Sequence, residues 1–121
     1  MDIPDYYDFR DYAKILYDSN RNGKPFYRVG VSIDCGQMTI SRYDYEEWDY
    51  NRKTGVVEIN YSLDLLNTQK LASALKRFNS VALVKEMKKC FGHKATYFEF
   101  LDNFKKFCEE NAIEYNYNVW Y

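Results

Sequence analysis

The stretch that decides the fold is FYRVGVSIDCGQMTISRYDYEEW, residues 26–48. From Phe26 to Asp34 apolar and polar residues alternate, which is typical of a strand with one buried face. Cys35-Gly36-Gln37 is a short connection, and a second extended segment runs from Met38 to about Trp48. Because so short a connection joins neighbouring antiparallel strands, the stretch predicts a β-hairpin.

Two further segments alternate in the same way. After the polar turn at residues 51–55, apolar residues recur at every second position from Val57 to Leu63. This predicts a third strand and an antiparallel three-stranded meander. The segment from Ile113 to Val119 also alternates, and we expect it to form a final strand at an edge of the sheet.

Helical spacing dominates elsewhere. Apolar residues from Tyr6 to Tyr17 recur at helical intervals after Pro4, which predicts a helix over about residues 4–19. Three more helices are predicted between the third strand and the last one, with caps at Asn67 or Thr68, at Ser80, and in a Thr96–Glu99 capping box. The third of these has the widest apolar stripe, and its predicted core residues are Phe100, Leu101, Phe104 and Phe107. The predicted fold is a single α+β domain over residues 1–121: an N-terminal helix, a three-stranded meander, three helices and a C-terminal strand at the sheet edge.

The composition is that of a soluble globular protein. Of 121 residues, 46% are hydrophobic and 29% are charged, and no apolar run reaches the roughly 20 residues that cross a bilayer. The N-terminus is acidic where a signal peptide would be basic. Three widely spaced cysteines, Cys35, Cys90 and Cys108, argue against a disulfide framework. These features predict a cytoplasmic protein that does not bind membranes.

Aromatic residues make up 19% of the chain, and 13 of them are tyrosines. Tyr and Trp are enriched at recognition surfaces because they combine a large contact area with a polar tip. One short segment interleaves four rings with four acids, in a half of the chain (residues 1–50) that carries a net charge of −4. We therefore expect a basic partner protein to bind Tyr43, Asp44, Tyr45, Glu46, Glu47, Trp48, Asp49 and Tyr50.

Catalytic and metal-binding motifs are weak. The single histidine, His93, lies in a polar loop without a nucleophile motif, and the scattered glycines form no phosphate-binding loop. Cys90 and His93 have half of a zinc-ligand spacing, which Cys35 and Cys108 would have to complete. We expect no catalytic residues, no metal and no cofactor.

Nucleic-acid binding is the alternative. Residues 68–106 carry nine basic and three acidic residues, and these bases could line one surface. The predicted element order over residues 4–78 resembles that of a double-stranded-RNA-binding domain. However, the loop and helix-start motifs that contact phosphates in that family are replaced at Cys35-Gly36-Gln37 and at residues 68–72. The residues that would carry this alternative are Lys70, Lys76, Arg77, Lys85, Lys88, Lys89 and Lys94.

These features favour a non-enzymatic inhibitor that blocks a nuclease or another nucleic-acid-handling enzyme. A small protein with an acidic, aromatic surface suits the basic groove of such an enzyme. One setting is a phage or mobile-element anti-defence protein of the anti-CRISPR kind. The other is an immunity protein that neutralises a nuclease toxin.

Overall fold

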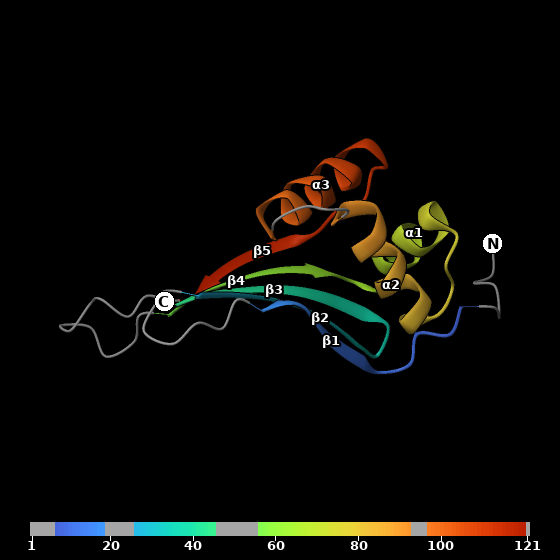
Figure 1. The fold of residues 1–121 in the computed structure, drawn as a ribbon. Helices are drawn as coiled ribbons and strands as arrows, with labels where there is room; N and C mark the ends of the chain where they lie inside the picture. Colours follow the sequence, from blue (N-terminus) through green and yellow to red (C-terminus); the bar gives the residue numbers. More distant parts are fainter. Residues whose placement is uncertain (1–6, 19–25, 46–55, 93–96, 121) are drawn as a thin grey trace.

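The computed structural model describes residues 7–18, 26–45, 56–92 and 97–120. Within these residues, four strands come first, then three helices, then a last strand (Figure 1). The strands are β1 (Tyr12–Asp18), β2 (Phe26–Asp34), β3 (Gln37–Tyr45), β4 (Val56–Leu63) and β5 (Asn116–Trp120). The helices are α1 (Leu65–Leu75), α2 (Ser80–Phe91) and α3 (Tyr97–Glu110). All five strands form one antiparallel sheet in the order β1-β2-β3-β4-β5.

The predicted fold is wrong in its N-terminal half. Residues 12–18 form the edge strand β1 and not a helix, so four consecutive strands precede the helices and the sheet has five strands. The error has a physical cause, since the register of β1 against β2 shifts between Ile15 and Tyr17. This β-bulge lets Leu16 and Tyr17, two consecutive residues, both contact the core, which imitates helical spacing. With β1 in place of the helix, the likeness in element order to a double-stranded-RNA-binding domain is lost.

The central hairpin follows the alternation in the sequence. β2 and β3 pair from Phe26↔Tyr45 to Asp34↔Gln37 without interruption. Cys35 and Gly36 form the turn with φ angles of +53° and +76°, the left-handed values that a tight type I′ hairpin turn requires. The turn therefore places Val29, Val31 and Ile33 on the same face of the sheet as Met38 and Ile40.

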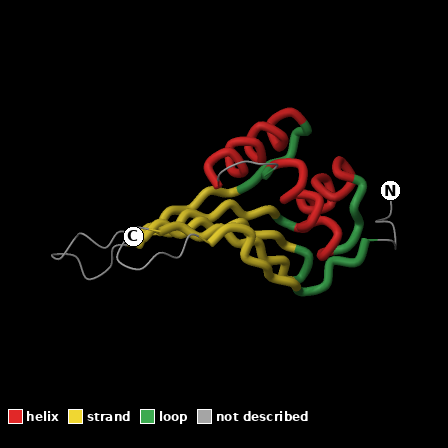
Figure 2. The backbone as a smooth tube through the Cα atoms, in the orientation of Figure 1, coloured by secondary structure: helices red, strands yellow, loops and turns green. Residues whose placement is uncertain are grey.

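The three helices lie on one side of the sheet (Figure 2). Asp64 caps α1 and Asn79 caps α2, each accepting a hydrogen bond of 2.8 Å from a backbone N–H of the first turn. The predicted caps at Asn67, Thr68 and Ser80 are therefore misplaced by one to four residues, and Thr96 lies outside the described residues.

The core lies between the helices and the sheet. Phe100, Leu101 and Phe104 of α3 are fully buried as predicted, whereas Phe107 is only half-buried at the rim of the core. Tyr61 of β4 packs against the ring of Phe104 at 6.3 Å between ring centroids. The helices thus bury one face of the sheet, and no described helix covers the other face. Among the described helices, none is both long and apolar enough to cross a membrane.

Candidate functional site

The two faces of the sheet carry different side chains. The face under the helices presents large apolar residues, which are Leu16, Val29, Val31, Ile33, Met38, Ile40, Ile59, Tyr61 and Leu63. No described helix lies on the opposite face (Figure 1). The middle of that face presents small polar side chains, which are Ser32, Thr39, Ser41, Asn60, Ser62, Asn116 and Asn118. We call this side of the sheet the uncovered face.

A continuous row of larger side chains crosses the uncovered face. The strand register sets five residues directly opposite one another, one from each strand: Asp18, Arg28, Tyr43, Glu58 and Trp120. Cross-strand neighbours on one face contact each other, so charged and aromatic groups form one strip across the sheet. We call these five residues the cross-strand row.

The two ends of the cross-strand row are exposed, and its three middle residues are half-buried. Trp120 is 64% exposed, the largest value among the exposed large hydrophobic residues that the structure describes. At the other end of the row, Arg28 Nη2 lies 3.4 Å from Asp18 Oδ2. Arg28 Nε is buried and has no hydrogen-bond acceptor among the described residues. The row therefore offers one exposed indole and one guanidinium group whose bonding capacity is only partly used.

Next to the row, the uncovered face is hollowed. A shallow, open groove of about 840 Å³ crosses β1, β2 and β3, with Ile15 on one side, Arg28 and Tyr43 on another, and Gly30 and Ser41 at its base. Gly30 keeps the base low, because an added Cβ there would meet only Lys14 O, at 3.5 Å. Its walls include both the aromatic ring of Tyr43 and the charged group of Arg28.

The predicted acidic-aromatic segment begins on the uncovered face. Tyr43 belongs to both the cross-strand row and the groove. Asp44 and Tyr45 complete β3 at the end of the sheet away from α1 and α2 (Figure 1). Residues 46–50 lie outside the described residues. Trp120 and Glu58 were missed by the sequence analysis, since nothing in the local sequence links a C-terminal tryptophan to Tyr43 across two strands.

The lysine-rich helices do not present one continuous row of free charges. Lys70 Nζ donates to Ala112 O at 3.3 Å, and Arg77 pairs with Glu86 at 2.8 Å. Lys88 lies over the ring of Tyr17, 5.5 Å from its centroid. Lys76 ends α1, Lys85 and Lys89 are exposed on α2, and Lys94 lies outside the described residues.

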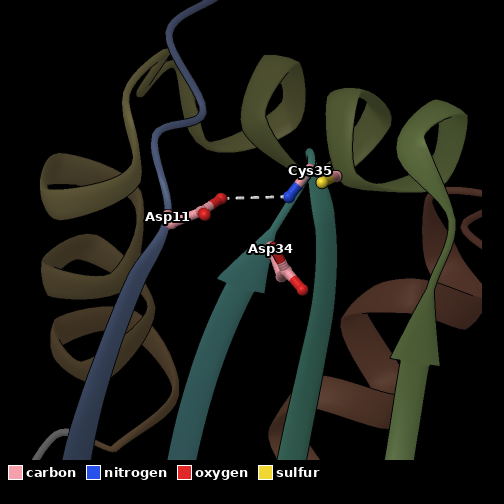
Figure 3. Close-up of side chains that lie close together, drawn as sticks. All are labelled: Asp11, Asp34 and Cys35. Atoms are coloured by element: carbon pink, nitrogen blue, oxygen red, sulfur yellow. Dashed lines mark hydrogen bonds between the residues drawn. The ribbon is translucent and has the colours of Figure 1, made fainter.

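A small cluster at the β2–β3 turn was also not predicted. Asp11, Asp34 and Cys35 have potential ligand atoms within 4.8 Å of one another, and all three are exposed (Figure 3). Asp11 Oδ1 accepts a hydrogen bond of 3.1 Å from the backbone N–H of Cys35, which ties the start of β1 to the turn. A hydrogen bond to Asp34 and the negative charges of Asp34 and Asp11 raise the pKa of the Cys35 thiol. The role that the geometry supports for Asp11 is to hold the turn in place.

The other two thiols are no better nucleophiles. Burial raises the pKa of Cys108 to about 12. Burial is the main cause that raises the pKa of Cys90, and the hydrogen bond that its Sγ donates to Glu86 adds to this rise. Since the thiolate is the form that attacks carbon and binds metals, all three cysteines are poorly suited to catalysis at neutral pH. Among the described residues the cysteines also do not gather into one ligand set, and His93 lies outside them.

Comparisons with known proteins give no match. No family model fits the chain, and neither the curated proteins nor the solved structures contain one that is detectably similar to it.

Proposed function

We propose that this protein is a non-enzymatic inhibitor that binds a partner protein through the uncovered face of its sheet. The observation that carries the proposal is the cross-strand row, in which exposed Trp120 and half-buried Tyr43 lie among charged groups. Tryptophan, tyrosine and arginine are the residues that most often contribute large shares of binding energy at protein interfaces.

The rest of the uncovered face supports the same proposal. Its serines, asparagines and Gly30 lie beside the two aromatic residues, along the same strands. Antibody paratopes combine the same residue types, because Tyr and Trp supply rigid contact area while Ser, Asn and Gly supply adaptable hydrogen bonds. Here these residues stand on paired strands, which position side chains more accurately than loops do.

Charge suggests the kind of partner. Asp18 and Glu58 bring two carboxylates to the cross-strand row, and four more acids, Asp44, Glu46, Glu47 and Asp49, follow Tyr43 along the chain. Carboxylates around an aromatic anchor steer encounters with a basic surface. Nucleases and other nucleic-acid-handling enzymes carry such a surface in their substrate groove, where a bound protein would exclude nucleic acid.

The biological setting belongs to the same proposal. We favour a phage or mobile-element anti-defence protein of the anti-CRISPR kind, acting in the cytoplasm of a bacterial host. An immunity protein that neutralises a nuclease toxin would use the same surface chemistry. The two settings differ in the partner, so the identity of the inhibited enzyme separates them.

The test compares two exposed aromatic residues of one strand. Trp120 lies on the uncovered face, whereas Tyr117 lies opposite Tyr61 on the helix side and is 56% exposed. Proteins captured from a bacterial lysate by the wild-type chain are identified, and the affinity of each purified candidate is then measured. We expect Trp120→Ala to weaken binding by roughly 2–4 kcal/mol and Tyr117→Ala to have little effect. Inhibition of the partner's nuclease activity should weaken in parallel.

Two outcomes would contradict the proposal. Equal losses in Trp120→Ala and Tyr117→Ala, with both variants folded, would show that the uncovered face is not the interface. Binding of the isolated protein to unrelated duplexes, with steep salt dependence, would favour the lysine-rich helices and a nucleic-acid-binding function.

A further inference from the structure

A second surface lies at the β1 edge of the sheet, on the helix side, between β1 and α2. The two elements run side by side in the same direction and are tied at both ends. Ser80 Oγ donates to Arg10 O at 2.6 Å near their beginning, and Tyr17 OH donates to Gly92 O at 3.3 Å near their end. Between these ties the elements separate and leave a cavity of about 260 Å³, which we call the edge notch.

The edge notch combines an apolar floor with a basic rim. Leu16 and Val84 are buried at its floor, and Val81 beside them is 55% exposed. An exposed valine next to buried apolar residues is surface that an apolar side chain would cover favourably.

Three lysines surround this apolar floor: Lys14 from β1, and Lys85 and Lys88 from α2. All three are exposed, and no carboxylate of the described residues pairs with any of them. The contact that Lys88 makes is with the Tyr17 ring. Three cations gathered without a counter-charge favour an anionic occupant.

β1 adds a third feature, an open strand edge. It is the first strand of the sheet, and one of its edges pairs with β2 while no described strand pairs with the other. An open edge presents backbone N–H and C=O groups to which an extended peptide can add as a further strand.

We propose that the edge notch binds an extended acidic segment of a partner protein, which adds a sixth strand to β1. In such a strand alternate side chains point toward α2. An apolar side chain would cover Val81 and Leu16, and acidic side chains two residues away would meet Lys14, Lys85 and Lys88. A phosphate backbone could use the lysines, but it could use neither the apolar floor nor the strand edge, which is why a peptide is favoured over nucleic acid.

This inference is independent of the proposed function, because the edge notch shares no residue with the cross-strand row. The probe is a short fluorescent peptide in which every second residue is threonine. The residues between the threonines, which would face α2, are glutamate, valine and glutamate in that order. Its binding to the full chain is measured by fluorescence anisotropy, and the contacted residues are mapped from amide chemical shifts by NMR. We expect shifts at β1 and α2, and no binding by the same peptide with lysine in place of glutamate.

The matched pair of variants is Lys85→Glu and Lys89→Glu. The two lysines are both exposed on α2 and the substitutions change the net charge equally, but Lys89 does not line the edge notch. We expect Lys85→Glu to weaken peptide binding about tenfold and Lys89→Glu to weaken it less than about threefold. Methylating the peptide's backbone nitrogens on the edge-facing side should abolish binding, since those N–H groups would pair with β1.

Several results would overturn the inference. Equal weakening by the two variants would indicate unspecific charge attraction. Unchanged binding of the methylated peptide would exclude strand addition. Tighter binding of an oligothymidine than of the peptide, lost in Lys85→Glu, would assign the notch to nucleic acid instead, and no peptide binding at millimolar concentration would also refute it.

Discussion

The two faces of the sheet are built from the same five strands and have opposite properties. On the helix side, Ile33, Met38 and Ile40 are almost completely buried. One residue along each strand, Ser32 and Thr39 face the other way and pair across the strands. Burial of apolar area stabilises the fold, whereas small polar groups in water contribute little to it. The comparison teaches that folding depends mainly on one face, which leaves the other face free to serve recognition.

The largest expected effect tests the helix side. Phe104 is fully buried against Tyr61 and Phe91. Phe104→Ala should lower the free energy of unfolding by about 3–5 kcal/mol, because it removes a packed ring and leaves a cavity. Chemical denaturation measures this loss.

Trp120→Ala is the control for that experiment. It removes an even larger ring from the uncovered face, and we expect the free energy of unfolding to change by less than about 1 kcal/mol. Similar losses in the two variants would break the comparison between the faces, since they would mean that the uncovered face also stabilises the fold.

An intermediate effect is expected at Gly30. A substitution there can separate the contribution of the uncovered face to stability from its contribution to partner binding. A glycine within a strand costs roughly 0.5–1 kcal/mol relative to alanine, and an added Cβ has room here. Gly30→Val should therefore keep or raise the free energy of unfolding, while its side chain fills the groove and weakens partner binding. Gly30→Ala serves as the smaller step. A destabilised Gly30→Val would show that the groove is closed by packing and is not an open recognition surface.

The smallest effect concerns the helix layer that covers the buried face. Asp64, the N-cap of α1, has a pKa below its usual 3.8. The main cause is the hydrogen bond that its carboxylate accepts from the backbone N–H of Asn67, and a hydrogen bond from the side-chain amide of Asn67 adds to it. A lowered pKa means that the cap's contribution to stability is complete above that usual value and is lost as pH falls below it. Asp64→Asn keeps a capping oxygen but does not titrate, so its unfolding should depend less steeply on pH in this acid range. Thermal unfolding of both proteins between neutral and acid pH measures the difference, and identical slopes would contradict this role for Asp64. Glu86, whose pKa is also lowered, should leave a remaining slope in both proteins.

The sequence predicted those elements in which the local pattern agrees with the tertiary environment. The β2–β3 hairpin was predicted because alternation and a turn with Gly36 coincide. The burial of Phe100 and Phe104 followed from the apolar stripe of α3. β1 was mistaken for a helix because its bulge sets Leu16 and Tyr17 on one side, and a bulge arises only from pairing with β2.

The candidate site was predicted only in part. Clustered rings and acids drew attention to the segment that begins at Tyr43, but no local pattern could add Glu58 and Trp120 to it. The row exists because strand register brings distant residues opposite one another. In the same way, Lys14 lies near Lys85 only because residues 12–18 form a strand beside α2.

By itself, the sequence determined which residues alternate and which recur at helical spacing, because those periods follow from local backbone geometry. It also determined that the chain is rich in tyrosine and that its charges are separated along its length. Only the tertiary structure decided which face of the sheet the helices cover. That choice depends on the summed burial of many side chains from distant segments, and it is what left Trp120 and Tyr43 together on the uncovered face.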